Sequence, residues 1–267
     1  MQIKAGVLFF IAAAGLALAA CGQKDAPALL AAQDSSRGQT DYLAPPQVLS
    51  VSALPGRGLE IRGAATSDPR TPDARVSGEA TDLKRYGATV GKNGRFVLEM
   101  PAATAPELIA ISEESGRRQL KTDGYLFVPP DAPDHAVVLR AGVPSRALQA
   151  GLIGTIDFDS GGGVAIAGVA TPGAAVDVSV DGKAVARATA DGQGFWEARL
   201  GVDKPGSHQV RVSSRGLDVV DRAFDFTAGT TTQIYTATRE PDGWRIAWAM
   251  PGGGVQTTLL LLGASRS

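Results

Sequence analysis

Short runs of alternating apolar and polar residues, separated by turn-forming residues, cover the chain from Gln47 onward. The clearest run is 174–180, in which Val176, Val178 and Val180 alternate with polar residues. Because successive side chains of a β-strand point to opposite faces, this pattern predicts a strand with one buried face. Turn signals rich in Gly, Pro, Asn and Asp recur between such runs. The pattern therefore predicts an all-β protein made of many short strands.

The spacing of the runs divides the chain into two predicted sandwiches and a C-terminal extension. Residues 47–142 hold about seven or eight short strands, which suit one β-sandwich domain. A second set of strands occupies residues 152–228, and residues 229–267 predict a three-stranded meander. A meander this small needs a partner surface. We expect it to pack on the second sandwich, and pairing with another protein chain is the alternative.

Three sequence runs characterise the second unit: IAGVATPGAAVDVSVDGK at 166–183, ADGQGFW at 190–196 and PGSHQVRV at 205–212. In these runs the unit resembles the bacterial Ig-like domain family. The resemblance implies a β-sandwich in which Trp196 is the main core filler between the two sheets. It implies an architecture used for binding or spacing, and no catalytic activity.

The first unit repeats parts of the second. The run Ile61-Arg-Gly63 matches Ile166-Ala-Gly168, and the run Asn93-Gly94-Arg95-Phe96 matches Gln193-Gly194-Phe195-Trp196. Both matches are separated by roughly 100 residues, the period expected for one domain copied in tandem. We therefore predict two Ig-like sandwiches in tandem, with the first a diverged copy.

The N-terminal residues 1–20 have the pattern of an export signal. Lys4 gives a basic start, and the run AGVLFFIAAAGLALAA that follows carries no charge. This run is short for a membrane span, which needs about 20 apolar residues, and it predicts a signal peptide. Its end, Leu18-Ala19-Ala20-Cys21-Gly22, resembles the lipobox of bacterial lipoproteins.

The lipobox resemblance implies cleavage between Ala20 and Cys21 and attachment of acyl chains such as palmitate to Cys21. Cys21 is the only cysteine of the chain, and a thiolate is the nucleophile that this chemistry needs. Two or three acyl chains anchor a protein stably, because each buried CH₂ contributes roughly 0.8 kcal/mol. Residues 21–46 mix Pro, Gly, Ser and Gln, which predicts a flexible tether. Gly22, in place of an inner-membrane-retaining Asp, favours the outer membrane.

Composition narrows the class of function. The 267 residues carry 26 Lys and Arg against 27 Asp and Glu, a net charge of −1, which argues against nucleic-acid binding. One Cys and two His, His135 and His208, cannot build an intramolecular disulfide, a zinc cluster or an Fe–S site. The sequence lacks a G-x-S-x-G elbow and the Gly-rich nucleotide-binding patterns. We therefore expect neither an enzyme nor a cofactor, and both histidines at the surface.

Trp244, Ile246 and Trp248 form an apolar stripe on one face of a predicted strand. Such a stripe has two interpretations. If the rings are exposed and coplanar, Trp244 and Trp248 make a face for a ligand or partner, on which a glycan could stack. If they are covered, the stripe belongs to the core of a sandwich.

Acidic residues gather at two places in the second unit. Asp157 and Asp159 precede a Gly-rich turn, and Asp218, Asp221 and Asp225 lie close together in the sequence. Calcium needs six to eight oxygen ligands from converging loops, and no D-x-D-x-D-G loop is present. We therefore interpret these residues as solvated acids at strand ends and expect no metal site.

These patterns together predict a non-catalytic, lipid-anchored cell-envelope protein that presents Ig-like modules for scaffolding or adhesion-type binding. Its expected contacts are the membrane, through the lipid, and another envelope protein or a glycan. The main alternative is a glycan- or peptidoglycan-binding module that uses Trp244 and Trp248. An enzyme is the third and least supported class.

Overall fold

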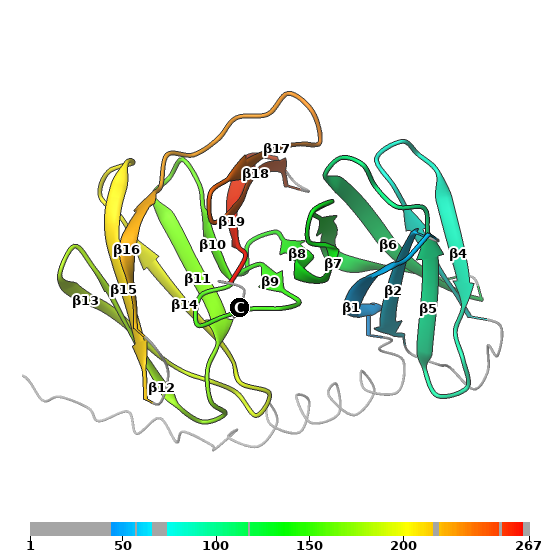
Figure 1. Ribbon diagram of the computed structural model, residues 1–267, viewed down its shortest axis with the longest axis horizontal. Coiled ribbons are helices and arrows are strands. Elements are labelled where there is room, and N and C mark those ends of the chain that lie inside the picture. Colours follow the sequence, from blue (N-terminus) through cyan, green and yellow to red (C-terminus); the bar gives the residue numbers. More distant parts are fainter. Residues whose placement is uncertain are drawn as a thin grey trace, which may run out of the picture. The chain divides into compact units, whose positions relative to one another are not determined.

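The computed structural model describes residues 44–56, 58–65, 74–116, 118–215, 219–250 and 253–263. The predicted signal peptide, Cys21 and nearly all of the predicted tether lie outside these residues. The described chain consists of antiparallel β-sheets with one short 3₁₀ turn, η1 (Pro133–His135), and no α-helix. The predicted all-β class is therefore confirmed (Figure 1). No helix within the described ranges has the length and apolar character needed to cross a bilayer.

Two sheets form the first sandwich. The β1 sheet has the strand order β1-β2-β5, and the β3 sheet has the order β4-β3-β6-β7-β8-β9. The strands of the first sandwich are β1 (Gln47–Leu54), β2 (Gly58–Ala64), β3 (Arg75–Glu79), β4 (Arg85–Thr89), β5 (Arg95–Met100), β6 (Glu107–Ser115), β7 (Arg118–Val128), β8 (Val137–Arg140) and β9 (Arg146–Ala147). Buried residues of both sheets, such as Ile61, Val76 and Leu98, meet between them and form its core.

The second sandwich also has two sheets. The β10 sheet has the strand order β14-β11-β10-β19-β18-β17, and the β12 sheet has the order β13-β12-β15-β16. The strands of the second sandwich are β10 (Thr155–Phe158), β11 (Gly163–Val169), β12 (Ala175–Val180), β13 (Lys183–Thr189), β14 (Phe195–Gly201), β15 (Ser207–Ser214), β16 (Val220–Asp225), β17 (Tyr235–Glu240), β18 (Gly243–Ala249) and β19 (Val255–Leu261). Val176, Val178 and Val180 are buried, as the alternation predicted.

The first seven strands of each sandwich follow one topology. The order β1-β2-β5 over β4-β3-β6-β7 recurs as β10-β11-β14 over β13-β12-β15-β16. The turn before β5 also recurs before β14: the Ala65 N–H donates to the Gly94 carbonyl at 2.8 Å, and the Ala170 N–H donates to the Gly194 carbonyl at 2.8 Å. The tandem arrangement predicted from two short sequence matches is thus confirmed by pairing and hydrogen bonding.

A glycine faces the large core aromatic in both copies. Gly63 pairs with Phe96, and Gly168 pairs with Trp196. An added Cβ at Gly63 would lie 2.1 Å from the Phe96 ring, and one at Gly168 would lie 2.1 Å from the Leu152 carbonyl oxygen. Both positions therefore require glycine, because the chain passes too close for any side chain.

Trp196 fills the core of the second sandwich. Its side chain is 1% exposed, and its indole N–H donates to the Leu152 carbonyl at 2.9 Å. The hydrogen bond satisfies the one polar group that burial of a tryptophan ring would otherwise leave without a partner. The predicted role of Trp196 as a core filler is confirmed.

The C-terminal meander continues a sheet of the second sandwich. Strand β19 pairs with β10, with Thr155 opposite Leu260 and Phe158 opposite Thr257. Figure 1 shows β19 between β10 and β18, in agreement with the strand order. The meander therefore does not lie on the sandwich as a separate layer. It widens the β10 sheet by three strands.

A third apolar core, here called the joining core, connects the two sandwiches. It combines residues of β6, β7, β8 and β9 with residues of the meander. The buried members of the joining core are Leu108, Phe127, Val137, Leu139, Ala147, Trp244, Ile246, Trp248 and Leu260. The C-terminal end of strand β7 is buried on both faces, since Leu126 packs into the first core while Phe127 packs into the joining core. The sandwiches are thus packed against each other through side chains.

Candidate functional site

Trp244 and Trp248 lie in the joining core and not on an exposed face. Their side chains are 7% and 0% exposed. Trp248 meets Tyr125 edge-on with ring centroids 6.2 Å apart, and Trp244 meets Phe127 edge-on at 6.0 Å. The interpretation of these rings as a ligand or partner face is therefore wrong. A stacking platform needs open ring faces, and here strands of the first sandwich cover them.

Polar contacts surround this interface. The Trp244 indole N–H donates to Asp131 Oδ1 at 3.2 Å, and Arg239 Nε donates to Asp131 Oδ2 at 2.8 Å. The Tyr235 hydroxyl donates to the Pro106 carbonyl at 2.6 Å. Partial burial by itself would raise the pKa of Asp131, but the hydrogen bonds from Arg239 and Trp244 lower the pKa overall. The meander is thus held by directional contacts as well as by apolar packing.

Asp157 is a buried acid that collects four hydrogen bonds. It is 4% exposed. Its Oδ2 accepts from the Ser145 backbone N–H at 2.6 Å, and its Oδ1 accepts from the Ser145 hydroxyl at 2.7 Å, the Gln256 amide at 2.9 Å and the Thr258 hydroxyl at 2.6 Å. Asp157, which lies on β10, therefore connects the loop between β8 and β9 to strand β19. Burial raises the pKa of Asp157, although the hydrogen bonds oppose the shift.

We expect Asp157→Asn to destabilise the protein by about 1–3 kcal/mol, the cost of a buried group left without its partner. An amide oxygen can replace Oδ1, but its NH₂ group then faces the Ser145 N–H, which is also a donor. Urea unfolding of the variant and the wild type measures the difference. An unchanged midpoint would contradict the four-bond assignment.

The wild type and Asp157→Asn also test how the stability of the protein depends on pH. Because the folded state raises the pKa of Asp157 above its ordinary value of 3.8, the native state binds the proton more tightly than the unfolded state. The contribution of Asp157 to the free energy of unfolding is therefore largest at low pH. It declines as pH rises from the ordinary pKa of an aspartate towards the raised pKa of Asp157 in the folded state. The stability difference between wild type and Asp157→Asn should narrow over that rise in pH.

The remaining acidic candidates have protein partners. Asp159 accepts from the Gly161 N–H at 2.7 Å in the turn after β10. Asp221 accepts from Gln209 at 2.8 Å and pairs with Arg211 at 2.8 Å. Asp218 lies outside the described residues. Within the described ranges, no three His, Cys, Asp or Glu side chains come together as metal ligands.

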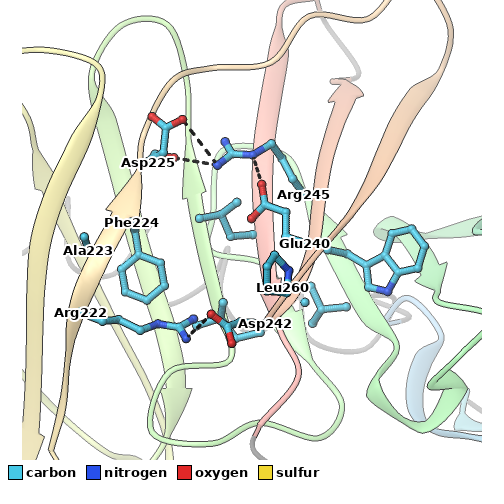
Figure 2. A pocket seen from close by; sticks show the side chains of 13 residues that line it. Arg222, Ala223, Phe224, Asp225, Glu240, Asp242, Arg245 and Leu260 are labelled. Atoms are coloured by element: carbon cyan, nitrogen blue, oxygen red, sulfur yellow. Dashed lines mark hydrogen bonds and ion pairs between the residues drawn. The ribbon is translucent and has the colours of Figure 1, made fainter.

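A polar cleft of about 250 Å³ opens between β16 and the turn that joins β17 to β18. Two arginines reach across it from opposite sides. Arg222 pairs with Asp242 at 2.8 Å, and Arg245 Nη2 donates to the Asp225 carbonyl at 3.1 Å. Figure 2 shows these two bridges on either side of Phe224. They connect the edge of the β12 sheet to the meander.

In the cleft, each arginine lies next to an acidic side chain. Arg245 Nε also pairs with Glu240 at 2.5 Å, and its guanidinium lies 4.0 Å from the Asp225 carboxylate. A hydrogen bond from Thr227 is the largest effect on the pKa of Asp225, and the pKa is lowered, with Arg245 contributing. The described lining holds no hydroxyl, thiol or imidazole side chain. Such a cleft can exchange ion pairs with a polar partner. Its lining includes Asp225 and Trp244, two residues that the sequence analysis singled out for other roles.

The comparisons with known proteins give only distant likenesses. No protein-family model matches the chain, and no curated protein matches it in sequence. The BSP domain of a biofilm-associated protein is similar at 14% identity and a TM-score of 0.26, over 70% of this chain and 30% of that one. The central fibronectin-III array of RIM-binding protein is similar at 14% identity and a TM-score of 0.29, over 78% and 80%. Invasin, a bacterial integrin-binding protein, is similar at 11% identity and a TM-score of 0.21, over 82% and 54%.

The class of protein therefore rests on the architecture. The chain spans about 30% of the length of the biofilm-associated structure. At identities and TM-scores this low, the likenesses carry no argument about function. What the strands and their pairing establish is a tandem of Ig-like β-sandwiches joined by a common core.

Proposed function

We propose that this chain is a non-catalytic, lipid-anchored protein of the bacterial cell envelope that presents a rigid pair of Ig-like sandwiches for scaffolding or adhesion-type binding. The observation that carries the proposal is the joining core, in which Trp244, Trp248 and Phe127 pack between the sandwiches. Domains joined only by a linker reorient freely, whereas an apolar interface fixes their orientation. A fixed orientation suits a scaffold that holds a binding surface in place.

The partner is proposed to be another envelope protein. The cleft beside β16 is the contact region that the proposal favours, because Arg222, Asp242 and Arg245 offer both signs of charge at its mouth. A complementary set of charges on a partner would give specificity and correct register. The glycan-binding alternative loses its support, since it depended on the exposure of Trp244 and Trp248.

The anchor is proposed to be the lipid on Cys21. The support is the lipobox resemblance of Leu18 to Gly22. A tether of about 25 residues has an r.m.s. span of roughly 25–30 Å, enough to hold the sandwiches clear of the lipid headgroups. The residue after the cysteine, Gly22, favours the outer membrane as the destination.

We expect Cys21→Ser to release the protein from the membrane fraction, because the hydroxyl does not replace the thiolate that accepts the lipid. Cell fractionation with detection of the protein measures the release. Mass spectrometry of the wild type should give an acylated Cys21 at the mature N-terminus. Recovery of an unmodified mature protein with another N-terminus would refute the anchor.

A matched control is Gly22→Asp, which leaves the cysteine in place. This variant should stay lipidated and move from the outer to the inner membrane. Membrane separation on a density gradient distinguishes the two locations. An unchanged outer-membrane location would contradict the role of Gly22 in sorting and would leave the lipid anchor untouched.

A further inference from the structure

His208 lies at the start of β15, at one end of the second sandwich. Its side chain is 14% exposed. The imidazole ring stacks on the Phe226 ring with centroids 5.3 Å apart and an interplanar angle of 20°. Phe226 in turn contacts Phe158 in the core. The ring is therefore held in position by packing, and its two nitrogens point in fixed directions.

Both ring nitrogens of His208 face hydrogen-bond acceptors. Nδ1 lies 2.7 Å from Asp181 Oδ2, and Nε2 lies 2.8 Å from the Lys204 carbonyl oxygen. A carboxylate and a peptide carbonyl only accept hydrogen bonds. A neutral imidazole carries one N–H and one lone pair, whereas the imidazolium carries two N–H groups. Only the protonated ring can donate to both partners at once.

The two contacts join separate segments of the chain. Asp181 lies in the turn between β12 and β13, and its Oδ1 also accepts from the Gln209 N–H at 2.9 Å. Lys204 belongs to the loop 202–206 between β14 and β15. That loop is also bonded to the chain after β16, since the Phe226 N–H donates to the Gly206 carbonyl at 2.8 Å. His208 thus connects a hairpin turn, a loop and the end of β16.

We propose that His208 is a pH-sensitive latch: the protonated ring holds the loop 202–206 against the β12–β13 turn, and deprotonation releases the loop while the Asp181 contact remains. The loop is the side that is released because a neutral ring keeps its single N–H for the carboxylate, the stronger acceptor. Its Nε2 lone pair then faces the Lys204 carbonyl oxygen at a distance where two acceptors repel.

The surrounding charges favour the closed latch. The elements that meet His208 bring Asp181 and Lys183 from the turn, Asp203 and Lys204 from the loop, and Asp225 from the end of β16. Asp181 contacts the ring directly, and its hydrogen bond is the largest cause that raises the pKa of His208 above 6.5. The Lys204 carbonyl adds to the rise and burial opposes it. The hydrogen bond from His208 in turn lowers the pKa of Asp181.

Because folding raises the pKa of His208, the sign of the dependence of stability on pH is fixed. A histidine whose pKa is higher in the folded state stabilises the fold below its unfolded pKa, and this contribution is lost as pH rises through the folded pKa. The latch is therefore closed below the pKa of the folded His208 ring, and it opens as pH rises through that pKa.

Hydrogen–deuterium exchange of the full mature protein across the titration of His208 tests the latch. The Phe226 amide, bonded to the loop at Gly206, should lose protection as the ring deprotonates, by up to about tenfold for each unit by which folding raises the pKa. The control is the Ala170 amide, which donates to Gly194 in a comparable turn of the same sandwich. Its protection should stay constant over the same range, after correction for the intrinsic exchange rate.

Two variants make the test specific. In His208→Gln, protection of the Phe226 amide should be low and independent of pH, because glutamine does not titrate. In Asp181→Asn, the loss of protection should move to lower pH, because the carboxylate that favours the charged ring is gone. The proposal is overturned if wild-type protection at Phe226 does not change across the His208 titration, or if His208→Gln retains the same pH dependence.

Discussion

Replacing Trp196 with alanine should lower the stability of the protein by about 3–5 kcal/mol, the range for buried Phe or Trp to Ala changes. The side chain fills the space between the β10 and β12 sheets and is 1% exposed. Its removal leaves a cavity in the core that also contains Ile166, Val178 and Val210, and it leaves the Leu152 carbonyl without the indole donor. Denaturant unfolding followed by circular dichroism measures the loss.

Val185→Ala is the control for this experiment, because Val185 lies on β13 of the same sandwich and is 39% exposed. Its effect should stay within about 0.5 kcal/mol, as expected of a surface substitution. Equal unfolding midpoints for Trp196→Ala and Val185→Ala would show that the ring does not support the sandwich.

Deleting the chain after Ala228 should cause a still larger effect, because it removes β17, β18 and β19 together. Strand β10 would lose one of its two neighbours, and its open edge could pair with other chains. The deletion would also expose the face of the first sandwich that carries Phe127, Val137 and Leu139. We expect aggregation or the loss of a cooperative thermal transition.

Size-exclusion chromatography and thermal unfolding measure this outcome. A shorter deletion that removes only residues 264–267 is the matched control and should leave both results unchanged. If the protein that ends at Ala228 melts like the wild type and remains monomeric, the meander is an independent docking element. The interpretation as a partner-binding segment would then replace the rigid scaffold.

Local patterns were enough to predict the strands and the repeated unit. The alternation of Val176, Val178 and Val180 follows directly from the two-residue period of a strand, so it needs no knowledge of distant residues. The burial of Trp196 was predicted from the resemblance to bacterial Ig-like domains, which implies an aromatic core filler at the start of this strand. Gly63 and Gly168 repeat because close chain approach excludes every other residue at both places.

The local pattern does not indicate which strands pair with each other. The meander was expected to pack on the second sandwich, and it extends the β10 sheet through pairs such as Thr155 with Leu260. Alternation tells which face of a strand is apolar, but it does not specify which edge the strand adds to. The same limit applied to Trp244 and Trp248. An apolar stripe has the same sequence pattern whether a ligand or another sandwich covers it.

The sites show the same division. Asp157 stands before a Gly-rich turn, where the sequence predicted a solvated acid, yet it is buried under donors from Ser145, Gln256 and Thr258. His208 was expected at the surface, and its ring is held between Asp181 and Phe226. The sequence by itself determined the strand pattern, the tandem repeat and the buried face of strands such as 174–180, because these follow from patterns along the chain. The tertiary structure alone decided the joining core, the surroundings of Asp157 and the contacts of His208, because hydrogen-bond partners and covering surfaces come from segments far apart in the sequence.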